Sequence, residues 1–136
     1  MSYLMIIDDD EDFATAVAKL LRDAGHEVTI ALDIQGGVDK MHERRPDLVV
    51  LDVMFPENGT AGFDLARAMR RKYEHFKNIP ILMLTAINAK SPVGFGSADI
   101  DEDWLPVTDF LEKPVDLDVL LERVSTLLAK PSQPRP

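Results

Sequence analysis

Residues 3–12 read Tyr-Leu-Met-Ile-Ile-Asp-Asp-Asp-Glu-Asp, an apolar run followed at once by five acidic residues. The run is apolar at every position, which is typical of a strand buried on both faces of a parallel sheet. Adjacent carboxylates repel one another, so gathering them at a strand end is costly unless a positive charge lies among them. The stretch therefore predicts a buried first strand that ends in a charged site.

A second apolar run, Leu48–Leu51, also ends in an acid, Asp52. If the two runs are neighbouring strands of a parallel sheet, their carboxyl ends place Asp8, Asp9 and Asp52 in one crevice. Three carboxylates with no cysteine or histidine nearby make an all-oxygen site, which suits Mg²⁺. We therefore expect a magnesium site at this edge of the sheet.

The rest of the chain alternates between strand and helix patterns. Further strands are predicted at 27–32, 81–84 and 110–111, and helices at 13–24, 34–41, 63–73 and 117–128. This alternation indicates an α/β fold, a doubly wound parallel sheet with helices on both faces. Ligands of such sheets bind outside the carboxyl ends of the strands. Thr85 and Lys113 also fall at strand ends, which makes them candidate site residues.

Two segments depart from the alternation. Residues 88–107 contain prolines, glycines and a run of acids, and no helical period survives there. We expect a long loop in this segment, and loops of such length are usually functional or mobile. The Pro-rich residues 130–136 are expected to be disordered, which leaves one domain at 1–129.

The composition narrows the classes of function. The chain has 15 basic and 24 acidic residues, a net charge of −9, which argues against nucleic acid as a partner. It has no cysteine, as is common in a reducing cytoplasm. The first apolar run is too short for a signal peptide or a membrane helix. We therefore expect a cytoplasmic protein that binds neither nucleic acid nor membranes.

The residues at the strand ends resemble the receiver domain of bacterial two-component response regulators. The matching elements follow successive strands: Asp8-Asp9, Asp52, Thr85-Ala86 and Lys113-Pro114. The resemblance covers residues 3–129 and implies five strands in the flavodoxin-like order 2-1-3-4-5. The fourth helix would be shortened or replaced by the loop at 88–107. Because no output domain follows, the resemblance implies a single-domain regulator of the chemotaxis type.

The resemblance implies a role for each of these residues. Asp52 would be the phosphoacceptor, since a carboxylate is a competent nucleophile toward phosphorus. Asp8, Asp9, Asp52 and the backbone carbonyl of Met54 would hold Mg²⁺, which would neutralise the phosphoryl oxygens. Lys113 would add a positive charge at one of these oxygens. The hydroxyl of Thr85 would make the final hydrogen bond.

A switch and a set of partners are also implied. A phosphoryl group on Asp52 would draw Thr85 toward it, and Phe110 would move into the vacated space. The phosphoryl group would come from a histidine kinase or a histidine phosphotransfer protein, and a downstream protein target would read the result. Since the family commonly dimerises around its fourth helix, the loop at 88–107 implies that any homodimer uses a non-standard face.

The reaction would be confined to the protein itself, so we do not expect an ordinary enzyme. The expected chemistry is phosphoryl transfer to Asp52 and slow self-dephosphorylation. Two positions that flank the site tune that hydrolysis in the family, here Met54 and Ile87. Neither side chain can position an attacking water, which implies a persistent phosphorylated state.

Two other functions stay open. In a phosphatase of the haloacid-dehalogenase type, Asp8 would be the nucleophile and Asp10 the acid. Such an enzyme needs a further acidic pair after a later strand, which the sequence does not provide. This hypothesis also gives Asp52 no role. The other alternative is a receiver-like interaction module that never takes up phosphate, for which the unusual segment at 88–107 is the main argument.

Overall fold

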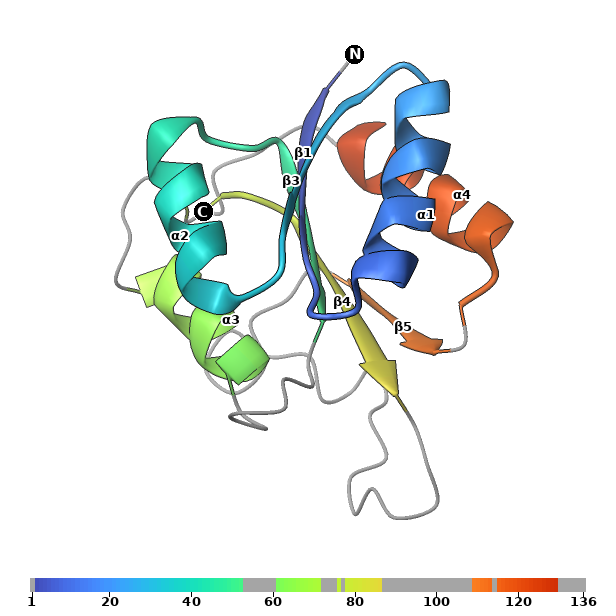
Figure 1. Cartoon of the computed structure of the whole chain (residues 1–136). Helices are drawn as coiled ribbons and strands as arrows, with labels where there is room; N and C mark the ends of the chain where they lie inside the picture. Colours follow the sequence, from blue (N-terminus) through green and yellow to red (C-terminus); the bar gives the residue numbers. More distant parts are fainter. Residues whose placement is uncertain are drawn as a thin grey trace.

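The computed structural model describes residues 2–52, 61–71, 76, 78–86, 109–113 and 115–129, in which strands and helices alternate (Figure 1). The strands are β1 (Tyr3–Ile7), β2 (Glu27–Ala31), β3 (Leu48–Asp52), β4 (Ile81–Ala86) and β5 (Asp109–Lys113). The helices are α1 (Glu11–Asp23), α2 (Ile34–Glu43), α3 (Ala61–Arg71) and α4 (Leu117–Ala129).

The described strands form one parallel sheet in the order β2-β1-β3-β4-β5. This confirms the predicted fold class and strand order. β1 and β3 are buried at every position, because each has a neighbouring strand on both sides and helices above and below. β2 and β5 lie at the two ends of the sheet, and β2 is only partly buried.

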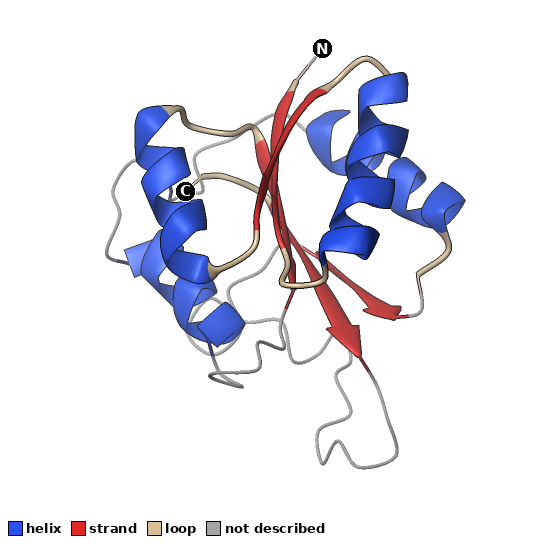
Figure 2. Cartoon of the chain, viewed as in Figure 1, coloured by secondary structure: helices blue, strands red, loops and turns tan. Residues whose placement is uncertain are grey.

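Helices cover both faces of the sheet. Figure 2 shows α2 and α3 on one side of the strands and α1 and α4 on the other. Side chains of β1 alternate between the two cores. Met5 and Ile7 pack with residues of α2 and α3, whereas Leu4 and Ile6 pack with residues of α1 and α4. A strand between two apolar layers has no solvent-facing side, which explains the unbroken apolar run near the N-terminus.

Local side-chain hydrogen bonds begin the helices. The carboxylate of Asp10 accepts a hydrogen bond of 3.1 Å from the backbone N–H of Phe13 and so caps the N-terminus of α1. Asp116 likewise accepts one of 2.9 Å from the N–H of Asp118 at the start of α4. After α1 the chain turns at Gly25, whose φ of 99° is strained for residues with a side chain.

Two strands, β4 and β5, are longer than the sequence predicts. β5 covers Asp109–Lys113, so Lys113 is its last residue and does not follow it. β4 includes Thr85 in the same way. Both extensions come from backbone pairing between β4 and β5, and such pairing continues past the apolar side chains from which a strand is recognised in a sequence.

Several sequence expectations fall on residues outside the described part. These are the backbone carbonyl of Met54, the side chain of Ile87, and the tail at 130–136. The loop expected at 88–107, in place of the family's fourth helix, also lies there; this segment precedes β5 and is not the helix labelled α4. The division into a domain at 1–129 and a tail also stays a prediction.

Candidate functional site

The carboxyl ends of neighbouring strands bring the first acids together. Ile7 of β1 pairs with Leu51 of β3, so the residues that follow them, Asp8 and Asp52, lie next to each other at one edge of the sheet. Asp52 also pairs with Leu84 of β4, which lies on its other side. The first and third strands are therefore neighbours in the sheet, as the sequence predicts.

Asp8, Asp9 and Asp52 form a compact cluster. One carboxylate oxygen of each residue lies within 4.8 Å of one oxygen from each of the others. The side chains of Asp8 and Asp52 are buried, with residue exposures of 1% and 3%, whereas Asp9 is exposed. Buried carboxylates so close together repel one another strongly, and a bound cation would offset that repulsion.

The spacing of these oxygens fits a small, hard cation. Mg²⁺ binds oxygen ligands at about 2.0–2.1 Å, so two ligands of one ion lie at most about 4.2 Å apart. Oxygens that already lie within 4.8 Å of one another need only small side-chain rotations to reach that separation. Carboxylate oxygens are also the donors that Mg²⁺ prefers over nitrogen or sulfur. The cluster is therefore chemically suited to this ion.

Backbone hydrogen bonds help to hold Asp8 in position. Its backbone N–H donates to the carbonyl oxygen of Ala31 at 3.0 Å, which ties it to the end of β2. Its carboxylate oxygen Oδ1 accepts from the backbone N–H of Asp10 at 2.9 Å. The side chain is thus oriented by the protein itself, as a preorganised ligand should be.

The remaining acids of the N-terminal run serve the helix instead of the cluster. Asp10 is the N-cap of α1, and Glu11 and Asp12 lie exposed in its first turn. Negative side chains at a helix N-terminus are stabilising because the N–H dipoles there are unpaired. Five adjacent acids are tolerated because the chain divides them between two sites with different demands.

Thr85 and Lys113 lie on the two strands that complete this edge of the sheet. Thr85 pairs with Glu112, and Ala86 pairs with Lys113, at the carboxyl ends of β4 and β5. Phe110 pairs with Met83, further from the edge. The roles of Thr85, Phe110 and Lys113 stay predictions.

One contributor to the site is not visible in the sequence. The carbonyl of Ala31 anchors Asp8, yet Ala31 has no functional side chain that could mark it. Its contribution depends on the register of β1 against β2, in which Ile7 pairs with Ala31. The only sequence signal is its place at the end of the second predicted strand.

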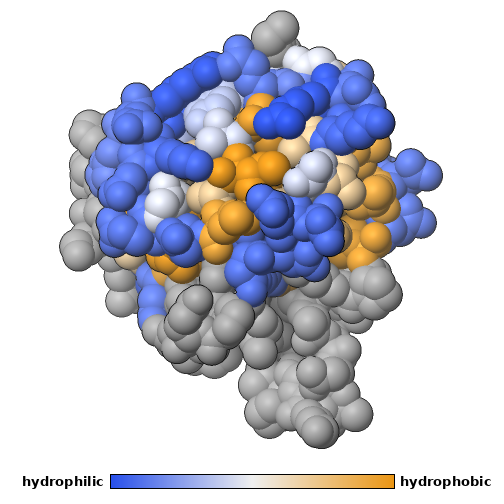
Figure 3. All heavy atoms as spheres, in the orientation of Figure 1, coloured by the Kyte–Doolittle hydropathy of each residue, from blue (hydrophilic) through white to orange (hydrophobic). Residues whose placement is uncertain are grey.

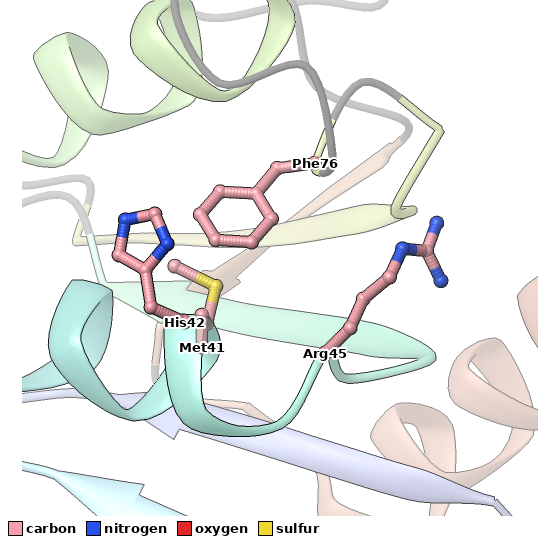
Figure 4. A pocket seen from close by; sticks show the side chains of 4 residues that line it. All are labelled: Met41, His42, Arg45 and Phe76. Atoms are coloured by element: carbon pink, nitrogen blue, oxygen red, sulfur yellow. The ribbon is translucent and has the colours of Figure 1, made fainter.

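A shallow depression elsewhere on the described surface has a different character. It measures about 260 Å³ and is lined by Met41, His42, Arg45 and Phe76 (Figure 4). The rings of His42 and Phe76 lie 5.0 Å apart between centroids and are tilted by 43°. These residues precede β3 and β4, so the depression lies near the amino ends of the strands. It contributes nothing to the acidic cluster.

Comparison with known proteins agrees with this geometry. A family model described as the response regulator receiver domain matches residues 4–125. Among curated proteins, the transcriptional regulatory protein AfsQ1 of Streptomyces coelicolor is 35% identical over 130 residues. The match covers 96% of this chain and 52% of AfsQ1, so the chain spans about half the length of that relative.

Solved structures show the same fold. A protein described as a response regulator from Chloroflexus aurantiacus has a TM-score of 0.77 and 32% identity, covering 95% of this chain and 98% of that one. The chemotaxis protein CheY4 of Vibrio cholerae has a TM-score of 0.76 and 28% identity, covering 93% and 98%. The receiver domain of NtrX from Brucella abortus, at 24% identity, supports the fold alone.

Within the described residues, no helix has the length and apolar character needed to cross a membrane.

Proposed function

This chain belongs to the family of response regulator receiver domains, and from that premise we propose that it takes up a phosphoryl group on Asp52 in two-component signalling. One observation carries the proposal: Asp52 is buried at the end of a central strand, beside Asp8 and Asp9. That arrangement offers a nucleophilic carboxylate together with the oxygen ligands for a cation that would assist it.

The proposed reaction is a transfer between a histidine and an aspartate. A carboxylate oxygen of Asp52 attacks the phosphorus of a phosphohistidine on a kinase or phosphotransfer protein. The new O–P bond forms as the P–N bond breaks, and the departing imidazole nitrogen keeps the bonding electron pair. The product is an energy-rich acyl phosphate. Its formation requires the incoming negative charge to be neutralised next to existing acids.

Mg²⁺ is the proposed source of most of that neutralisation. Asp8, Asp9 and Asp52 would hold the ion, with the backbone carbonyl of Met54 as a further predicted ligand. When bound, the ion supplies positive charge that offsets the acids and the phosphoryl oxygens. The hydrogen bond from Asp10 to Asp8 orients one ligand in advance and so lowers the cost of assembling the site.

Lys113 and Thr85 are the proposed partners of the phosphoryl group. Both residues lie at the carboxyl ends of their strands, at the edge of the sheet where Asp52 lies, which supports their assignment. The ammonium group of Lys113 would bind one phosphoryl oxygen through a charge-assisted hydrogen bond. The hydroxyl of Thr85 would make a hydrogen bond to another.

We assign the switch to Thr85 and Phe110. Phosphorylation would draw Thr85 toward Asp52, and the ring of Phe110 would occupy the space left behind. Phe110 pairs with Met83, two residues before Thr85 on β4, so the strands allow this coupling. Because phenylalanine has no hydroxyl, the change would act through packing and would alter which downstream protein binds.

The partners are proposed only by class. Receiver domains interact with histidine kinases and with downstream effectors, and a partner of each class is proposed for this chain. The relatives differ in their outputs, since AfsQ1 is a transcriptional regulatory protein and CheY4 a chemotaxis protein. A protein target, a cytoplasmic location and a homodimer through a non-standard face stay predictions from the sequence.

The phosphatase alternative is disfavoured by the hydrogen bonds of its two aspartates. It needs Asp10 as a free acid close to Asp8. In this structure the Asp10 carboxylate caps α1 by accepting from the N–H of Phe13. The carboxylate of Asp8 accepts from the Asp10 backbone and belongs to the cluster with Asp52. Asp52 would have no task in that enzyme, although it is buried in the cluster.

Labelling with a small phosphodonor tests the proposal. The protein is incubated with acetyl phosphate and Mg²⁺, and the modified residue is located by mass spectrometry after trapping the acyl phosphate. We expect modification of Asp52 that is lost in Asp52→Asn. Asp10→Asn is the matched control, since asparagine also caps helices, and it should be labelled normally.

Three results would count against the proposal. Modification of Asp8 would favour the phosphatase, and no modification of any residue would favour the phosphate-independent module. Unchanged labelling of Asp52→Asn would exclude Asp52 as the acceptor.

The labelled protein also tests how long the phosphorylated state persists. Slow loss of label with Mg²⁺ present is expected, because Met54 and Ile87 cannot orient a water molecule.

A further inference from the structure

β2 is an edge strand whose outer side has no neighbouring strand in the described sheet. Its inner side pairs with β1: the N–H of Glu27 donates to the Ser2 carbonyl, and the Ala31 carbonyl accepts from Asp8. Backbone groups of alternate residues point to opposite sides of a strand. Val28 and Ile30, which lie between these inward positions, therefore direct their N–H and C=O groups outward.

Two cationic side chains bind the outward carbonyl groups. Arg22 donates from Nη2 to the carbonyl oxygen of Val28 at 2.8 Å. Lys40 donates from Nζ to the carbonyl oxygen of Ile30, also at 2.8 Å. The two cations come from α1 and α2, which lie on opposite faces of the sheet (Figure 1). The edge is thus covered from both sides.

Without these cations, the edge would be a suitable surface for pairing. Hydrophobic residues lie at the surface between α1 and α2 (Figure 3). Val28 is buried, Ile30 is partly buried, and Leu32 just beyond the strand is 43% exposed. An apolar strand edge with free backbone groups is a template for another strand.

We infer that Arg22 and Lys40 close the β2 edge against pairing with a second copy of this chain. An incoming strand would have to displace two charge-assisted hydrogen bonds before its own N–H groups could reach these carbonyls. A symmetric dimer through β2 would also bring Arg22 and Lys40 of one copy close to those of the other. Like charges placed together in this way disfavour the contact.

A closed β2 edge limits how this protein can associate. Contacts between copies must use a different surface, and so must any partner that binds by adding a strand. The device is independent of the acidic cluster and of the proposed phosphorylation, since it involves neither.

Removing both cations tests the inference. The double variant Arg22→Met and Lys40→Met keeps the long apolar stems and frees both carbonyls. Sedimentation velocity of the full chain at rising concentration should show larger species than the wild type forms at the same concentration. The matched control is Lys19→Met with Arg67→Met. It loses the same charge from an exposed position on α1 and from a cation that pairs with Asp64 within α3, and it should sediment like the wild type.

Hydrogen exchange identifies the surface involved. In the double variant, amides of Val28 and Ile30 should become more protected as association proceeds, with circular dichroism showing that the fold is kept. If the double variant unfolds, each single variant gives the same test with one carbonyl freed. A folded variant that sediments like the wild type would overturn the inference.

A third substitution separates edge pairing from association through unfolding. Proline at position 30 removes an outward N–H that β1 does not use, and proline is tolerated on edge strands for that reason. Added to the double variant, Ile30→Pro should restore the sedimentation behaviour of the wild type. Association that persists in this variant would show that the β2 edge is not the contact, and would also overturn the inference.

Discussion

At the scale of single residues, neighbouring acids in this chain have different surroundings and different tasks. Asp8 is buried and receives a hydrogen bond from the backbone of Asp10, whereas Asp10 caps a helix. Asp9 is exposed and still belongs to the cluster. The difference arises because the chain turns from strand to helix within these residues, so that consecutive side chains point in different directions.

One ion pair makes a pH-dependent contribution to stability. Arg44 lowers the pKa of Glu27 through a side-chain hydrogen bond and its positive charge, and Glu27 in turn raises the pKa of Arg44. The Arg44 guanidinium also lies 4.0 Å from the centroid of the Tyr3 ring. A carboxylate whose pKa is lowered by folding stabilises the fold above its unfolded pKa, and that contribution is lost as the pH falls through the folded pKa.

We therefore expect Glu27→Gln to lower the free energy of unfolding slightly at neutral pH. The difference from the wild type should vanish once the pH falls below the lowered pKa of Glu27, which lies under its usual value of 4.5. Urea unfolding of both proteins across this pH range measures it. Since both side chains are more than half exposed, high salt should also reduce the difference. A difference that stays constant in acid would show that the charge of Glu27 is not its source.

At the scale of elements, close packing of α2 on β1 and β2 leaves no room for a side chain at Gly37. A Cβ atom there would lie 2.6 Å from Cδ1 and 2.9 Å from Cγ1 of Ile7, a fully buried residue. It would also lie 3.6 Å from the Cβ of Ala31. Ile7 directly precedes Asp8, and the carbonyl of Ala31 accepts a hydrogen bond from the N–H of Asp8. The packing of α2 and the geometry of the acidic cluster therefore depend on the same two residues.

Gly37→Ala should destabilise the protein. Alanine favours a helix over glycine by about 0.5–1 kcal/mol, but overpacking a core costs about 1–3 kcal/mol, so we expect a net loss near 1 kcal/mol. Ile7→Val removes the Cδ1 atom and should relieve much of the clash. A double-mutant cycle by urea unfolding should therefore show favourable coupling between the two substitutions. Simple additivity would mean that α2 moves instead.

At the scale of the whole molecule, the parallel sheet gathers residues that are far apart in the sequence. Acids from the ends of β1 and β3 meet because every described strand runs in the same direction, so that all carboxyl ends lie at one edge. Helices on both faces bury the strands and hold this edge in place. The same sheet has an end strand, β2, whose outer carbonyls are covered by Arg22 and Lys40.

Mg²⁺ should stabilise the whole fold if it binds the acidic cluster. Binding to the native state alone adds about 2.7 kcal/mol when the ion is present at about 100 times its Kd. We expect a rise in Tm with MgCl₂ that is reduced in Asp9→Asn, a change at an exposed ligand that disturbs little packing. Asp12→Asn, at an exposed acid in the first turn of α1, should keep the full rise. Equal shifts in all three proteins would place the ion elsewhere.

The amino-acid sequence alone predicts the sheet, its helices and the family. Apolar runs, helical spacing and acids at strand ends are local patterns, and the motifs that follow successive strands support the family resemblance. They also identify Asp8, Asp9 and Asp52 as neighbours, because parallel strands end at a common edge. The family match and the strand order confirm this part of the prediction.

Only the tertiary structure decides the contacts that depend on register and on the distance between elements. The Ala31 carbonyl that anchors Asp8, the tight approach of Gly37 to Ile7, and the binding of Arg22 and Lys40 to the edge of β2 are of this kind. Residues in these contacts are ordinary in the sequence, since a backbone carbonyl or a surface lysine has no local pattern. Their roles arise when strands pair in one register and helices pack at one distance, and these depend on the whole chain.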